Sequence, residues 1–165
     1  MKKVSYFLFL VCFSGLIAFV SCQQPVERKQ TNIEKTTFGS IPDGRIVDVY
    51  TLRNAQGMEI KISTLGGTIV SWTAPDRFGK YEDITLGCDS LSSYLRGTPF
   101  FGAIIGRYGN RIAKGKFTLD NATYSLATNN IGNSLHGGLK GFDKVLWTVV
   151  PVESKEPALK LTYTA

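Results

Sequence analysis

The sequence predicts an all-β fold, an antiparallel β-sandwich, for a chain of 165 residues. Apolar and polar side chains alternate with period two, for example where Met58, Ile60 and Ile62 interleave with polar residues, as expected of a strand with one buried face. Turn residues separate such segments. No long helical segment intervenes, and strands without crossover helices form antiparallel sandwiches or barrels.

The N-terminus has the order of a secretory signal peptide, over residues 1–21. Lys2 and Lys3 precede an apolar run from Val4 to Val20, and Ser21 and Cys22 follow it. The residues before Cys22 resemble a bacterial lipobox, which implies a lipid on Cys22 and an exported protein held on a membrane at the periplasmic or cell-surface side. Soluble secretion is one alternative, because Phe19 occupies the position three places before the cysteine where Leu is usual. An uncleaved anchor is the other, because the apolar run is at the short limit for crossing a bilayer, which takes about 17 to 25 residues.

Residues 22–37 are predicted to be a lipidated N-terminus followed by a flexible linker, because they are polar and lack apolar periodicity. The folded domain is expected to begin near Phe38 and to comprise residues 38–165.

Within that domain the predicted strands lie at about 46–53, 58–63, 67–73, 82–87, 116–120, 123–127, 145–152 and 158–164. Residues 120–122 are a short polar connection and predict a hairpin, although glycine is the stronger turn residue. The helix-like segment is 90–95, which Asp89 or Ser90 can cap and which residues 97–99 end.

Composition excludes several kinds of site. Cys12 and Cys22 precede the domain, so Cys88 has no internal disulfide partner and is expected to be a small buried side chain. With His136 as the only histidine, a zinc site of nitrogen and sulfur ligands cannot be assembled, and no metal or cofactor is expected. The basic residues are spread singly, which argues against nucleic-acid binding.

Two glycine-rich loops, at 102–115 and 132–141, carry most of the polar side chains of interest. Glycine lets a backbone approach a ligand closely, although tight turns account for many of these glycines equally well. Neither loop fits a phosphate-binding pattern, and no G-x-S-x-G segment indicates a hydrolase. Planar hydrogen-bonding side chains beside aromatic rings suit a sugar, although a lone histidine is often structural. The cluster comprises Arg107, Asn110, Arg111, Asn129, Asn130, Asn133 and His136, with Phe100, Phe101, Tyr108, Phe142 and Trp147.

Two longer motifs resemble one known family. Residues 100–115, FFGAIIGRYGNRIAKG, resemble the FGA-IGR-NRIA-G segment of the aldose 1-epimerases. Residues 133–144, NSLHGGLKGFDK, resemble their N-x-LHGG-x-x-GFDK segment, and weaker similarity extends over about 40–165. The resemblance implies a galactose mutarotase-like supersandwich and an enzyme that interconverts the α and β anomers of hexoses without a cofactor.

By this resemblance Asn110, Arg111 and His136 bind an aldohexose such as glucose or galactose, while Arg107 and Asp143 are structural members of their motifs. Mutarotation needs a base for the anomeric hydroxyl and an acid for the ring oxygen. In the family these are a second histidine, in a segment like T-N-H-x-Y-[FW]-N, and a glutamate near the C-terminus, and neither segment occurs in these residues.

We therefore expect a truncated, N-terminal part of the family's domain with no catalytic residue of its own, apart from an assisting role for His136. We therefore also expect little or no mutarotase activity from the isolated chain. A non-catalytic carbohydrate-binding module and an inert fragment are the alternatives.

Overall fold

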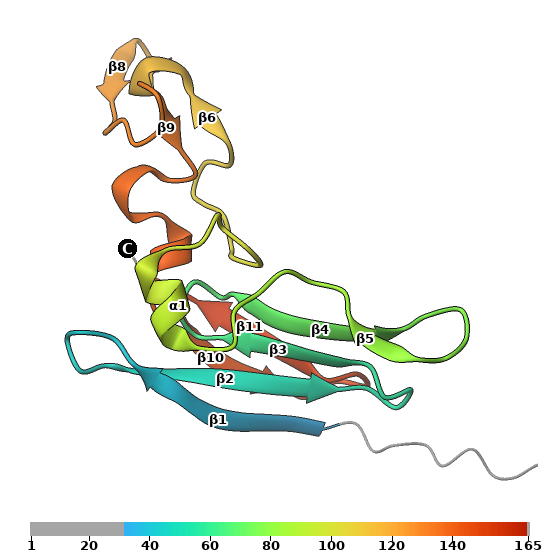
Figure 1. Ribbon diagram of the computed structural model, residues 1–165. Coiled ribbons are helices and arrows are strands. Elements are labelled where there is room, and N and C mark those ends of the chain that lie inside the picture. The colour runs from blue at the N-terminus through green and yellow to red at the C-terminus, as the bar shows by residue number, and fades with distance from the viewer. Residues whose placement is uncertain (1–31, 165) are drawn as a thin grey trace, which may run out of the picture.

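The computed structural model describes residues 32–164, which form two layers of antiparallel strands and a smaller unit above them (Figure 1). The first layer is a five-stranded sheet in the order β1-β2-β3-β4-β5, and each neighbouring pair is antiparallel. The strands of this sheet are β1 Asn32–Ser40, β2 Ile46–Arg53, β3 Glu59–Ser63, β4 Ile69–Pro75 and β5 Tyr81–Asp83. Its order follows the chain, as alternating segments joined by turns predict.

The second layer is the hairpin of β10 Thr148–Val152 and β11 Ala158–Thr162, which lies behind the sheet in Figure 1. The Tyr50 hydroxyl donates to the Val149 carbonyl at 3.4 Å and joins the two layers. On the other side of the sheet, α1 Leu91–Arg96 covers one end, where Leu91 lies against Gly39. The all-β sandwich predicted from the alternation is therefore confirmed.

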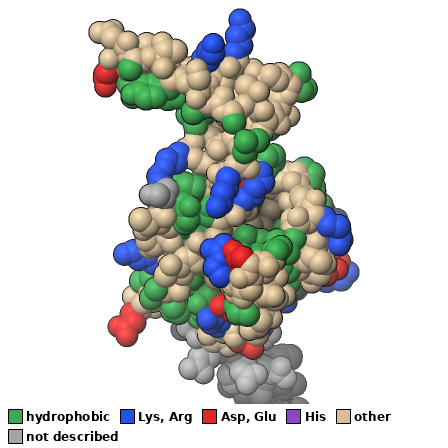
Figure 2. All heavy atoms as spheres, turned by 90° about the vertical axis from the view of Figure 1, so that its left-hand side faces the viewer, with side chains coloured by type: hydrophobic (Ala, Val, Ile, Leu, Met, Phe, Trp, Pro, Cys, Tyr) green, Lys and Arg blue, Asp and Glu red, His purple; other side chains and the backbone are tan. Residues whose placement is uncertain are grey.

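Residues 106–144 form the upper unit, which stands on one end of the sandwich. Short antiparallel pairs build it: β6 Arg111–Ile112 pairs with β9 Ser134–Leu135, and β7 Lys116–Leu119 pairs with β8 Ala122–Ser125. Three 3₁₀ turns complete it, η1 Ala113–Gly115, η2 Gly138–Lys140 and η3 Phe142–Lys144. Figure 2 shows apolar side chains exposed on this unit.

The predicted hairpin forms between β7 and β8. Leu119 pairs with Ala122, so the turn consists of Asp120 and Asn121, whose φ angles are 49° and 61°. Positive φ at both central residues is the type I′ arrangement that matches the twist of a hairpin, and Asp and Asn tolerate it better than other non-glycine residues.

The prediction that residues 22–37 form a flexible linker is wrong for residues 32–37. Strand β1 begins at Asn32 and pairs with β2 along its length. The Lys35 ammonium and the Asp48 carboxylate lie 2.7 Å apart and tie this edge strand to its neighbour. Most side chains of β1 are exposed, because it is an edge strand. Its sequence therefore lacks the alternation of apolar and polar residues that marks a half-buried strand, and it resembles that of a linker. Residues 1–21, Cys22 and the rest of the predicted linker lie outside the described residues.

Strand β5 is shorter than predicted and ends at Asp83. The Asp83 carboxylate accepts hydrogen bonds from the backbone N–H groups of Trp72 and Thr85, which ends the strand ladder in a turn. Cys88 consequently lies in a loop and is half-buried, not buried as expected. Across residues 32–164 no helix is both long and apolar enough to span a bilayer.

Candidate functional site

The pairing of β6 with β9 brings the two sequence motifs together. Arg111 lies opposite Leu135, and Asn110 and His136 are the next residues outward. The Asn110 N–H donates to Nδ1 of His136 at 3.0 Å, and the His136 N–H donates to the Asn110 carbonyl at 3.0 Å. Both residues have left-handed backbones, with φ angles of 64° and 53°. The structure therefore places Asn110, Arg111 and His136 side by side.

Arg111 is held by two side-chain amides. Its Nη1 donates to Oδ1 of Asn110 at 3.2 Å, and its Nε donates to Oδ1 of Asn130 at 2.9 Å. The side chain is otherwise exposed, and its Nη2 has no hydrogen-bonding partner among residues 32–164. Arg111 can therefore present donors to a ligand from a fixed position.

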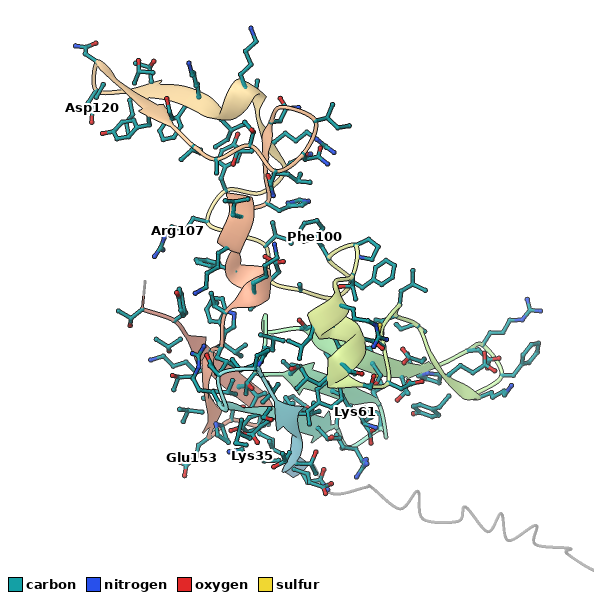
Figure 3. All side chains as sticks on the ribbon, turned by 60° about the vertical axis from the view of Figure 1, so that its left-hand side comes forward. Lys35, Lys61, Phe100, Arg107, Asp120 and Glu153 are labelled. Atoms are coloured by element: carbon teal, nitrogen blue, oxygen red, sulfur yellow. The ribbon has the colours of Figure 1, made fainter. Side chains whose placement is uncertain are left out.

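His136 is oriented by its backbone contact and by an aromatic ring. Because Nδ1 accepts the Asn110 N–H, the neutral imidazole carries its proton on Nε2 and can donate from there. The Phe100 ring meets the imidazole edge to face, with 4.7 Å between ring centroids. Phe100 comes from the segment that joins the sandwich to the upper unit, as Figure 3 shows.

Two asparagines of the predicted polar cluster brace the backbone of the site. The Asn129 amide donates to the carbonyls of Leu135 and Gly138 at 3.0 and 2.9 Å, and its oxygen accepts the Leu135 N–H at 2.7 Å. The Asn133 oxygen accepts the Lys114 N–H at 3.1 Å. These contacts fix β9 and the turn before it, and hence the position of His136.

The two glycine-rich loops pack too closely for side chains at certain positions. A Cβ on Gly137 would lie 2.0 Å from the Gly106 carbonyl oxygen, and one on Gly106 would lie 2.3 Å from the Phe142 ring. Gly137 also has a φ of 91°, which disfavours other residues. Close packing and tight turns, rather than the approach of a ligand, therefore explain the glycines at these two positions.

A groove of about 920 Å³ adjoins Asn110 and Arg111. Apolar side chains form much of its wall, Arg107, Arg111 and Lys140 supply cations, and no carboxylate of the described residues lines it. The Arg107 guanidinium lies 5.3 Å from the centroid of the Phe142 ring, over its face. Within the described part of the chain, no three His, Cys, Asp or Glu side chains are grouped so that they could bind a metal ion.

Taken together, Arg111, His136 and the Asn110 amide offer hydrogen-bond donors and planar groups beside an aromatic ring. Such a site suits an uncharged or anionic ligand rich in oxygen atoms. The sequence placed all three residues in one cluster. It did not reveal the β6–β9 pairing or the Arg111–Asn130 bond, because a two-residue strand has no measurable periodicity.

Comparison with known proteins gives one consistent result. A family model described as aldose 1-epimerase matches residues 48–165. Galactose mutarotase from Bos taurus is 48% identical over 118 residues, which cover 71% of this chain and 34% of that protein. Aldose 1-epimerase from Escherichia coli strain K12 is 38% identical over 121 residues, which cover 73% of this chain and 35% of that protein.

A solved structure supports the same relationship. The crystal structure of galactose 1-epimerase from Lactobacillus acidophilus NCFM superposes with a TM-score of 0.67 at 25% identity, covering 80% of this chain and 38% of that one. The chain spans about a third of the length of the curated relatives it matches.

Proposed function

The chain belongs to the aldose 1-epimerase family, and we propose that Asn110, Arg111 and His136 form the sugar-binding part of a mutarotase site. The hydrogen-bonded arrangement of these three residues carries the proposal. A pyranose presents its ring oxygen and hydroxyl oxygens as acceptors, which Arg111 and His136 can bind, and the Asn110 amide can both donate and accept. The substrate class is an aldohexose such as galactose or glucose.

In the proposed reaction, a base removes the proton of the anomeric hydroxyl while the C1–O5 bond breaks and an acid protonates O5. The resulting open-chain aldehyde rotates about C1–C2, and the reverse steps close the ring to the other anomer. Donors fixed near the sugar oxygens stabilise the negative charge that develops as this bond breaks. Arg111 and His136 are suited to that role because the free protein already holds both side chains in place.

Proton transfer itself needs an acid and a base next to the sugar. Within residues 32–164 no carboxylate forms a hydrogen bond with Asn110, Arg111 or His136, and none lines the adjoining groove. We therefore propose that the three residues bind and polarise the sugar, and that a preparation of these 165 residues alone has little or no mutarotase activity.

A second candidate function is carbohydrate binding without turnover. The donor-rich composition of the site favours it, because binding requires only the contacts that Asn110, Arg111 and His136 provide. An inert fragment is the remaining alternative, and it predicts a chain without a stable fold. Dispersed amide signals in the NMR spectrum of the chain would contradict that alternative.

A titration with D-galactose, followed by amide NMR, tests the proposal. We expect saturable shifts at millimolar galactose for residues of β6 and β9. Arg111→Ala should abolish them, whereas Arg77→Ala should not, because Arg77 lies in the distant β4–β5 turn. A folded wild-type sample without saturable shifts rejects sugar binding. Polarimetry of α-D-galactose in the same sample separates binding from turnover, and a rate well above buffer contradicts the expected inactivity.

We also propose that the protein is exported and anchored to a membrane by a lipid on Cys22. The order of the N-terminal residues supports this proposal, since a basic start, an apolar run and a small residue precede that cysteine. Metabolic labelling with an alkyne palmitate analogue tests it. The label should appear in the wild type and be absent from Cys22→Ala, and equal labelling of both proteins contradicts lipidation at this position.

A further inference from the structure

We propose that Asn130 is a positioning residue, which holds the Arg111 guanidinium in its binding geometry before a sugar arrives. This inference rests on the proposed sugar-binding role of Arg111. Asn130 would act only through that side chain.

The contacts of Arg111 distinguish Asn130 from the other asparagines. Asn130 accepts from Nε at 2.9 Å, and Asn110 accepts from Nη1 at 3.2 Å. Contacts at two different nitrogen atoms restrict the torsion angles of the guanidinium as well as its position. Asn110 is next to Arg111 in the chain, so Asn130 is the partner that ties Arg111 to a separate segment of the fold.

The Asn130 side chain extends from a fixed point of the backbone. Asn130 and Asn133 exchange two backbone hydrogen bonds, at 3.1 and 2.8 Å, and form a tight turn. The Asn133 side chain connects this turn to the Lys114 N–H just after β6, and the Asn129 side chain connects it to β9. Both strands of the site therefore determine where the Asn130 oxygen lies.

Restriction of Arg111 favours binding for an entropic reason. An exposed arginine samples many rotamers, and a ligand that requires one of them must overcome the lost freedom. A contact that already selects this rotamer in the free protein reduces that cost at the binding step. Loss of one such hydrogen bond should weaken sugar affinity by about 3- to 10-fold.

Two substitutions at position 130 separate positioning from general damage. Asn130→Ala removes the acceptor, whereas Asn130→Asp keeps an acceptor of the same shape and adds a negative charge opposite the Arg111 guanidinium. Asn54→Ala is the matched control. Asn54 also accepts backbone hydrogen bonds in a turn, from Gln56 and Met58, but that turn joins β2 and β3 in the sandwich.

The first measurement needs no sugar: the solvent-exchange rate of the Arg111 Nε–H, by ¹⁵N NMR of the full chain. We expect slow exchange in the wild type, Asn130→Asp and Asn54→Ala, and exchange at least about 5-fold faster in Asn130→Ala, because one hydrogen bond protects the proton. Equal rates in the wild type and Asn130→Ala overturn the proposal. So does a rate in Asn130→Asp as fast as that in Asn130→Ala.

The second measurement is galactose affinity in the same four proteins. Asn130→Ala should bind about 3- to 10-fold more weakly than the wild type, and Asn130→Asp should recover most of the loss. If Asn130→Ala binds galactose as tightly as the wild type, the claim that Asn130 strengthens sugar binding is wrong. If the wild type binds no hexose, the proposed function fails, but the exchange rates still decide whether Asn130 holds Arg111.

Discussion

Asn110 and His136 exchange two hydrogen bonds, from the Asn110 N–H to Nδ1 of His136 and from the His136 N–H to the Asn110 carbonyl, both at 3.0 Å. These bonds continue the β6–β9 pairing beyond its last residues. The imidazole thus has a structural contact on Nδ1 and leaves Nε2 for a ligand. A substitution that keeps the acceptor for the Asn110 N–H but removes the Nε2 donor can separate the structural role of His136 from its role in binding.

Position 136 provides the first prediction. Asn tolerates a left-handed backbone and can offer Oδ1 to the Asn110 N–H, so His136→Asn should retain stability but lose galactose binding, because it lacks the Nε2–H. His136→Ala should lose both, with a cost in unfolding free energy of about 0.5 to 1.5 kcal/mol. Urea unfolding and a galactose titration test the pair. Normal binding by His136→Asn contradicts the role assigned to Nε2.

The second prediction concerns the shape of Arg111. Lysine keeps the positive charge but cannot bond to the Asn110 and Asn130 oxygens as a planar fork does. Arg111→Lys should therefore weaken galactose binding by about 10-fold, a loss of about 1.4 kcal/mol. Affinity equal to that of the wild type would show that charge alone is sufficient.

The third prediction compares two glycines with positive φ. Gly137→Ala places a Cβ 2.0 Å from the Gly106 carbonyl oxygen, whereas Gly132→Ala meets no atom within 4 Å. Their φ angles are 91° and 73°, so both substitutions introduce backbone strain. Gly137→Ala should lower the unfolding free energy by more than about 1 kcal/mol and by clearly more than Gly132→Ala. Equal losses in urea unfolding would contradict the close approach of the two loops.

The fourth prediction is a pH dependence at Asp83. Burial tends to raise the pKa of the Asp83 carboxyl, but hydrogen bonds from Thr85 and Trp72, together with nearby Lys61, hold it below its ordinary value. A lowered folded-state pKa stabilises the protein above the unfolded-state pKa of about 4, and this contribution is lost as pH falls through the folded-state pKa. Asp83→Asn should therefore be less stable than the wild type near pH 7, and the difference should shrink below about pH 4. A constant difference in urea midpoints contradicts this assignment.

The parts of the fold that the sequence revealed are those with local signals. Period-two alternation located β2, and a polar connection located the turn at Asp120 and Asn121. Strand β1 was missed because an edge strand with exposed side chains needs no apolar alternation. Strand β5 was predicted too long because the hydrogen bonds of Asp83 end it, and apolar residues continue beyond it.

In the site, too, features with a local sequence signal were predictable and contacts between distant segments were not. Its three proposed residues were found through motifs, and the structure brings them together. The Arg111–Asn130 bond could not be predicted, because the two residues are 19 apart in the chain and the β7–β8 hairpin lies between them. The tautomer of His136 likewise depends on a backbone N–H from another strand.

The most direct test of the central claim uses His136, the only histidine of the chain. A long-range ¹H–¹⁵N NMR spectrum assigns its two ring nitrogens without ambiguity, with and without galactose. We predict an Nε2–H tautomer whose Nε2 signal shifts saturably with galactose in the wild type but not in Arg111→Ala. An Nδ1–H tautomer, or ring nitrogens that do not respond to galactose in the folded protein, would contradict a sugar site at Asn110, Arg111 and His136.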